Sequence, residues 1–324
     1  MAKRKPDPVN DIYDLKKLED LIATRTPSRP TKRLAAAPAE SIAGVVKRHF
    51  TFGLGPRVMP HRREWLDALD SSQRPDGTWP RIPHSCPWCG EARVFGRITA
   101  AYWHLGARPR RPIKPLERLA RRPALVRWLE GLNWDHPWGG AGHDCIGLVQ
   151  AMANIGVCTR GAVQTVLDFV NERMRAPRTG LIAKGRFVRS GDQRFGSAFA
   201  FGIVFEFFKA DFPWAERLVK FILSRQHASG SWSKDFPGGS FNMDAAWMLS
   251  RWTRYGSKHR GAAEAALRRL ARWLKRQVAK LRGSEKEEAL MKIATTLLLL
   301  QEVFPSAAHR NRVWRYSCDV TIHP

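Results

Sequence analysis

Five glycines spaced about fifty residues apart constrain the fold of this chain more than any other feature. The steps between them are 54, 49, 50 and 53 residues. Each follows an apolar run at helical spacing, such as Leu218, Phe221 and Ile222. A glycine past such a run is expected to stop the helix, because it adopts the left-handed conformation without steric cost. The five are Gly77, Gly131, Gly180, Gly230 and Gly283.

A second helical stretch lies within each period, and it differs in character from the first. The first type is amphipathic: the run 260–282 places Arg269, Arg272 and Arg276 opposite a leucine stripe. The second type is apolar nearly all round, as in 293–300, and a helix that is apolar on every side is buried on every side. These second helices are expected near 92–105, 141–155, 194–208, 241–254 and 286–302.

This alternation predicts an all-α fold. An apolar inner ring inside an amphipathic outer ring would make a single α/α toroid, or α/α barrel, of about five or six helical hairpins. An open helical solenoid is the alternative. The predicted toroid spans 36–324, and residues 1–35, rich in Pro, Lys and Arg, are expected to form a poorly ordered basic arm with one short helix near 10–23.

The pattern Gln-x-x-x-Gly-x-Trp occurs twice, over 73–79 and 226–232, and Arg217 lies upstream of the second copy. It resembles the QW motif of squalene and hopene cyclases. With the repeat period, it makes the chain similar to the toroid superfamily of terpenoid cyclases and protein prenyltransferases. The resemblance implies a protein that acts on, or binds, an isoprenoid or other lipid in an aromatic-lined central cavity. The Asp-x-Asp-Asp and Asp-Asp-x-x-Asp motifs of terpene-forming enzymes are absent from the sequence.

Two other functions fit the same residues. A carbohydrate-active α/α-barrel lyase or hydrolase would stack Trp side chains on the sugar rings of an acidic polysaccharide. A non-catalytic accessory toroid would need no complete catalytic motif, and a fold of this kind does not by itself fix a function. The 13 Trp and 16 Phe of the chain suit a packed core as well as the wall of a cavity.

The net charge of +26, from 55 basic and 29 acidic residues, points to an anionic partner. An anionic or hydrophobic small molecule or lipid is the expected substrate, and peripheral contact with a membrane fits the same charge. A nucleic acid is not expected, because no binding motif accompanies the cations. Met1–Pro8 is not followed by the apolar region of a signal peptide, and no stretch reaches transmembrane length. The expected location is the cytoplasm, and peripheral contact with the inner membrane is compatible with that location.

Polar residues gather just before the predicted inner helices and in their first turns. Loops at that register would open on one mouth of a toroid, where helix N-termini suit anions. His143, Asp144 and Asp244 are the candidate catalytic residues, because imidazole and carboxylate groups can transfer protons. The candidate substrate-binding residues are Arg186, Arg189, Arg194, Asn242, Trp138 and Trp247.

The segment Cys86-Pro87-Trp88-Cys89 has the spacing of two zinc ligands. Zinc is therefore the candidate cofactor, with Cys86 and Cys89 as its ligands. A complete site needs two more ligands, and His143 and Cys145 would supply them only if the fold brings them close. A redox role would need a thioredoxin-like context, which is absent. Ordinary buried or loop cysteines are the remaining alternative.

Overall fold

The computed structural model describes residues 15–51, 59–80, 88–208, 210, 212–234, 237–253, 257–282 and 284–304. Over these residues the chain is helical and has no strand, only an isolated bridge between Arg175 and Ile182. The all-α prediction is thereby confirmed. The described chain divides into two compact units. Unit 1 joins the residues up to Thr26 to those from Pro213 onwards, and unit 2 comprises Pro27–Phe212.

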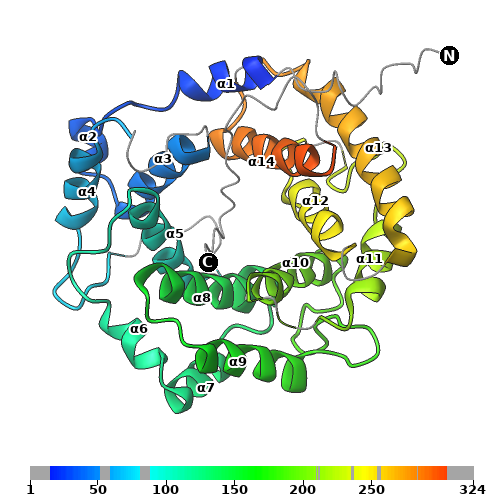
Figure 1. Cartoon of the computed structure of the whole chain (residues 1–324), viewed down its shortest axis with the longest axis horizontal. Helices are drawn as coiled ribbons and strands as arrows, with labels where there is room; N and C mark the ends of the chain where they lie inside the picture. Colours follow the sequence, from blue (N-terminus) through cyan, green and yellow to red (C-terminus); the bar gives the residue numbers. More distant parts are fainter. Residues whose placement is uncertain are drawn as a thin grey trace. The chain divides into compact units, whose positions relative to one another are not determined.

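Unit 2 is built from two layers of helices. One layer places α3, α5, α8 and α10 side by side in chain order, while α7 and α9 pack together in the other (Figure 1). The bounds are α2 Lys32–Ala35, α3 Ala39–Thr51, α4 Arg62–Ser71, α5 Glu91–His104, α6 Lys114–Leu119, α7 Arg122–Glu130, the π-helical turn η1 Trp138–Gly142, α8 His143–Ile155, α9 Arg160–Phe169, the π-helical turn η2 Val170–Met174 and α10 Gly191–Phe207.

Unit 1 repeats the two-layer plan with fewer helices. Its α12 packs against α14, and the amphipathic α11 and α13 pack against α12. The helix α1 lies in the predicted N-terminal arm, yet it packs on α14 and buries Leu18 and Ile22 completely. The bounds are α1 Leu15–Ala23, α11 Ala215–Ser224, α12 Ser240–Trp252, the 3-10 turn η3 Ser257–His259, α13 Arg260–Val278 and α14 Glu287–Val303.

The predicted apolar helices correspond to α5, α8, α10, α12 and α14, each within a few residues of the expected bounds. Their burial agrees with the hydrophobic pattern: ten of the thirteen residues of α8 are buried, against two of the nine of α7. A helix that is apolar all round therefore occupies the inner layer of its unit.

The prediction for the five glycines was only partly right. Gly77, Gly180 and Gly230 have positive φ angles of 82°, 74° and 98°, but each lies six residues beyond the end of its helix. Gly131 directly follows α7 in a right-handed conformation with φ −81°, so the left-handed stop predicted there is wrong. The amide of Gly131 instead bonds the carbonyl of Arg127, which closes the last turn without a left-handed residue. Gly283 lies outside the described residues.

The two Gln-x-x-x-Gly-x-Trp segments act as clasps between successive helical hairpins. Gln73 Nε2 donates to the carbonyls of Gly77 (3.0 Å) and Arg111 (2.9 Å), and Trp79 Nε1 donates to the carbonyl of Leu69. The second copy makes equivalent bonds: Gln226 to Gly230 and Ala266, and Trp232 to Ile222. The motif therefore stabilises the repeat.

Glycine is required at the fourth position after each Gln because the next hairpin approaches the backbone there. A Cβ on Gly77 would lie 1.9 Å from the carbonyl oxygen of Pro112. One on Gly230 would lie 2.7 Å from that of Arg269. Positive φ adds a second reason, since residues with side chains rarely adopt it.

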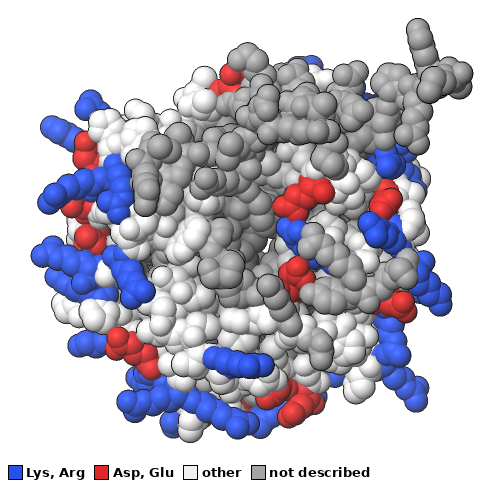
Figure 2. All heavy atoms as spheres, in the orientation of Figure 1, with Lys and Arg blue, Asp and Glu red and all other residues white. Residues whose placement is uncertain are grey.

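Basic side chains are dispersed over the surface. Figure 2 shows Lys and Arg at many separate places on the described part of this face, not in one patch. Separately, none of the helices in the described ranges combines the length and apolar character needed to cross a membrane.

Candidate functional site

A close approach of α5 and α8 builds the candidate site in unit 2. Gly96 and Gly147 face each other at the crossing, where a Cβ on Gly147 would lie 2.4 Å from the carbonyl oxygen of Ala92. Only glycines allow two helices to approach this closely. The approach places the N-terminal ends of the two helices together, so Cys89, just before α5, meets His143, the first residue of α8.

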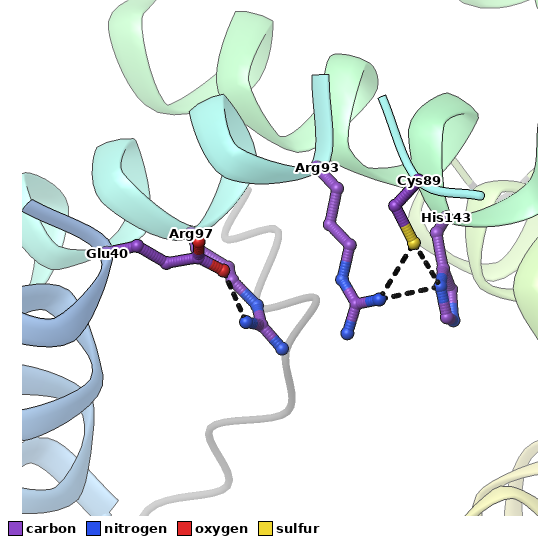
Figure 3. Close-up of polar contacts among 5 residues, drawn as sticks. All are labelled: Glu40, Cys89, Arg93, Arg97 and His143. Carbon is purple, nitrogen blue, oxygen red and sulfur yellow. Dashed lines mark hydrogen bonds and ion pairs between the residues drawn. The ribbon is translucent and has the colours of Figure 1, made fainter. Parts of the chain in front are cut away.

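Cys89, Arg93 and His143 form a compact polar cluster (Figure 3). The Sγ atom of Cys89 lies 3.3 Å from Nδ1 of His143 and 2.7 Å from the carbonyl oxygen of Gly139, to which the thiol donates. Nη1 of Arg93 lies 3.0 Å from Sγ and 2.9 Å from Nδ1. Because a guanidinium can only donate, Nδ1 is the acceptor and the imidazole carries its proton on Nε2. Cys89 is buried, while His143 and Arg93 are half-buried.

The cluster extends along one face of α5. Cys89, Arg93 and Arg97 follow one another at intervals of four residues, a spacing that puts side chains on the same face of a helix. Arg97 forms an ion pair of 2.5 Å with the buried carboxylate of Glu40 on α3. In Figure 3 Arg93, Cys89 and His143 converge, with the Arg97–Glu40 pair beside them. Arg97 is thus paired with an acid, whereas the guanidinium of Arg93 lies beside the thiol and the imidazole and is the group suited to an anion.

The neighbouring π-helical turn supplies the acceptor for Cys89. Its glycines allow a tight path: a Cβ on Gly140 would lie 2.6 Å from the carbonyl oxygen of Asn133. Trp138, a predicted substrate-binding residue, lies over Gly196 of α10, and its ring is 5.9 Å from that of His143 in an edge-on arrangement. The structure thus brings Trp138 beside the predicted catalytic histidine. Interruptions of this kind are frequent at functional sites.

Asp144, which the sequence suggested as a catalytic residue, bonds backbone amides at the start of α5. Its Oδ2 accepts from the backbone N–H of Gly90 at 2.7 Å, and its Oδ1 lies 3.4 Å from that of Arg93. The buried carboxylate therefore caps the N-terminus of α5 from the neighbouring helix, as helix dipoles favour. These bonds fix the cluster and leave His143 as the better candidate for proton transfer.

The other cysteines of the described chain do not join the cluster. Burial, and next the charge of Asp144, raise the pKa of the Cys145 thiol well above its usual value. Cys145 is completely buried, and among the described residues it belongs to no group of three His, Cys, Asp or Glu side chains that could hold a metal. Burial raises the pKa of Cys158 to about 11.

The predicted residues of α12 lie in unit 1. Asn242 is fully buried, and its Oδ1 accepts from Ser231 Oγ (2.9 Å) and from the backbone N–H of Trp232 (2.8 Å), so it holds the second clasp. Asp244 is buried as well. Trp247 is a core residue whose ring meets that of Trp252 edge-on at 6.3 Å.

The predicted arginines lie near the start of α10. Arg186 and Arg189 are exposed, and Arg194 is half-buried, with its Nε donating to the carbonyl of Val188. Arg186 lies over the ring of Phe187, 5.4 Å from its centroid. The three remain candidates for an anionic group.

The sequence did not point to a column of stacked rings beside the cluster. Trp88 stacks on His136 at 4.2 Å, and His136 stacks on Phe187 at 4.6 Å, with interplanar angles of 20° and 25°. We call Trp88, His136 and Phe187 the ring column. Each residue lies in a loop that precedes an inner helix, which is the only signal the sequence offered.

Of the two predicted metal ligands, Cys86 and Cys89, the structure describes only Cys89. Cys89 Sγ and His143 Nδ1 are 3.3 Å apart, close to the roughly 3.6 Å expected for two ligands of one tetrahedral zinc. The Arg93 guanidinium lies against both atoms, which a zinc ion would have to displace. Over the described residues, no group of three His, Cys, Asp or Glu side chains could hold a metal. Cys86 lies outside the described residues.

Comparison with known proteins found no matching family model, no matching curated protein and no matching solved structure. The coordinates therefore define the class of protein by themselves. It is an all-helical protein built from layered helical hairpins, with a thiol, imidazole and guanidinium cluster at the N-terminal ends of two adjacent inner helices.

Proposed function

We propose that this chain is an enzyme of the terpenoid cyclase and protein prenyltransferase type, with its hairpins closed into one α/α toroid. Its substrate would be an isoprenoid or other lipid with an anionic head group. The observation that carries the proposal is the contact of Cys89, Arg93 and His143 on the inner layer of unit 2. The layered hairpins and the two clasp motifs support the toroid.

Each member of the cluster has a role in this proposal. Arg93 binds the anionic head group, because its guanidinium has several donors and a permanent charge. The same guanidinium, 3.0 Å from Sγ, would stabilise negative charge that develops on sulfur. Once the guanidinium has turned from Nδ1 to the head group, the thiol can turn from the Gly139 carbonyl to His143. The S–H bond then breaks, its electron pair stays on sulfur, and the proton passes to Nδ1 of His143, 3.3 Å away. Asp144 holds α5 in register.

Zinc would bind at the same place. Cys89 and His143 would hold the ion, with Cys86 as a third ligand from the Cys-x-x-Cys segment. Bound zinc would keep the thiol deprotonated at neutral pH. Metal analysis of the purified protein tests this point: about one zinc per chain is expected, and Cys89→Ser should abolish it while Cys158→Ser leaves it unchanged. A wild-type protein without zinc would remove the metal from the proposal.

The substrate class is tested by binding of farnesyl diphosphate, measured by calorimetry. Arg93→Gln removes a charged hydrogen-bond donor and should weaken binding about tenfold or more. The exposed Arg122 at the start of α7 provides the control, since Arg122→Gln removes a cation elsewhere on unit 2. Absence of binding by the wild type, or equal affinity of the Arg93 and Arg122 variants, would refute the lipid diphosphate as substrate.

A carbohydrate-active enzyme is the second candidate, favoured by the exposed Trp88 beside exposed arginines. An aromatic face stacks on sugar rings, and Arg186 and Arg189 would meet the carboxylates of an acidic polysaccharide. His143 would then act as base. Cleavage of polygalacturonate, lost in His143→Ala, is the expected result for this candidate. A protein that binds a ligand but turns over neither substrate class would fit the third role, a non-catalytic accessory toroid.

A further inference from the structure

The ring column brings together two side chains that proteins usually bury. Trp88 is 45% exposed and Phe187 is 42% exposed, and they are the two exposed large hydrophobic side chains among the residues that the structure describes. They are not scattered, because each stacks on a face of the same imidazole, His136. Exposed apolar side chains that gather in one place mark an interaction surface.

The surface around the column is basic. The segment 183–191 carries three exposed cations, Lys184, Arg186 and Arg189, and the exposed acid Asp192 follows it directly. The exposed acid Asp135 also lies near, and its Oδ1 accepts from the backbone N–H of Arg186 at 2.8 Å. The three cations of 183–191 still outnumber the two nearby acids, Asp135 and Asp192. The partner of this surface is therefore anionic and has an apolar part.

We propose that the ring column and the cations of 183–191 dock this protein on an anionic lipid bilayer. Tryptophan and phenylalanine enter the boundary between head groups and acyl chains, and nearby Lys and Arg attract acidic head groups. A sugar or a nucleobase would need hydrogen-bond acceptors beside the rings to read its hydroxyl or amino groups. The cations mainly supply donors, which match the phosphate oxygens of acidic head groups, and the polymer tests below decide between a bilayer and an acidic polysaccharide.

The position of the surface adds a reason for this partner. Trp88 directly precedes Cys89, and His136 lies two residues before Trp138, whose ring contacts His143. A bilayer on the ring column would lie next to the thiol and imidazole. The docking does not depend on the chemistry proposed for that cluster, because it uses other side chains.

Co-sedimentation with phosphatidylcholine vesicles, with and without phosphatidylglycerol, tests the proposal on the full chain. The wild type should sediment with the acidic vesicles. The double variant Trp88→Ala, Phe187→Ala removes two half-exposed rings and should weaken binding by about tenfold for each ring. Arg186→Gln with Arg189→Gln should weaken it about fivefold for each charge. Circular dichroism confirms that each variant is folded.

Matched controls separate docking from general charge and from the proposed chemistry. Arg118→Gln with Arg122→Gln removes two exposed cations of unit 2 elsewhere in the chain and should change binding by less than about twofold. The Arg93→Gln variant tests the cluster separately, through farnesyl diphosphate binding, because Arg93 is the residue proposed to bind a head group there. Trp88→Phe should keep binding but lose part of the fluorescence quenching caused by brominated phosphatidylglycerol.

Three results would overturn the proposal. The first is equal binding to neutral and acidic vesicles. The second is a double ring variant, Trp88→Ala with Phe187→Ala, that binds as well as the wild type. The third is binding of polyuridylate or polygalacturonate that requires Trp88 and Phe187 while vesicles are not bound, which would assign the surface to that polymer.

Discussion

The crossing of α5 and α8 gives the sharpest test of how the candidate site is assembled. Gly147→Ala would place a Cβ 2.4 Å from the carbonyl oxygen of Ala92 and 2.5 Å from the Cα of Arg93. Ordinary contact begins at 3.4 Å, so the helices must separate by about 1 Å. Overpacking of this kind costs about 1–3 kcal/mol.

A second glycine provides the control. Gly44 lies inside α3, and a Cβ added there would meet nothing within 4 Å. Gly44→Ala should therefore stabilise the protein by about 0.5–1 kcal/mol through helix propensity alone. Both substitutions gain the same helix-propensity contribution. The difference between their free energies of unfolding, measured with urea, therefore gives the cost of the steric clash at Gly147, about 1–3 kcal/mol.

The same change should disturb the site. A separation of about 1 Å between α5 and α8 would take Cys89 Sγ and His143 Nδ1 from 3.3 Å to beyond hydrogen-bonding range. Gly147→Ala should then lose zinc or farnesyl diphosphate binding where the wild type shows it, while Gly44→Ala retains it. If the two variants have equal stability, the close approach of the helices, and with it the reasoning for the site, is refuted.

Three further predictions concern other parts of the fold. Gln73→Ala removes three hydrogen bonds of the first clasp and should lower the free energy of unfolding by about 2–4 kcal/mol. The control, Gln164→Ala at an exposed position, should lower it by less than about 0.5 kcal/mol. Burial lowers the pKa of His49, so the folded protein favours the neutral imidazole. The contribution of His49 to stability is therefore complete above about pH 6.5 and is lost as the pH falls through the lowered pKa. His49→Gln should remove that slope from urea unfolding curves. Iodoacetamide should not label Cys158 of the folded protein until the pH approaches the raised pKa of that thiol, about 11. The reagent should reach the buried Cys145 on denaturation, and labelling of Cys145 before denaturation would contradict its burial.

Much of the secondary structure could be predicted from local patterns. The apolar runs placed the inner helices within a few residues, because a helix buried on all sides needs apolar residues at every position. The clasps were also predictable: a Gln with a Gly four residues later and a Trp two beyond has the donors and the turn that the structure uses. The caps were less predictable, because Gly131 ends α7 with a right-handed turn set by its own hydrogen bonds.

The candidate site could be predicted only in part. Cys89 was a zinc candidate, and His143 was a candidate for acid–base chemistry and, if the fold brought it close, for the same zinc; 54 residues separate them in the chain. Arg93 was not a candidate, because a lone arginine on a helix looks like a solvated side chain. Asp144 was a catalytic candidate, but a carboxylate in a first turn can equally serve a neighbouring helix, and here it caps α5.

The sequence by itself therefore determined the helices and their two classes, since these follow from the pattern of residues close in the chain. The clasps were determined only in part, because their bonds to Arg111 and Ala266 join residues 38 and 40 positions apart. Only the tertiary structure decided that Cys89, Arg93 and His143 share one site and that Trp88, His136 and Phe187 form one column. The physical reason is the depth to which α5 and α8 approach, which depends on Gly96 and Gly147 meeting across the crossing. No local pattern reports which glycine of one helix will face which glycine of another.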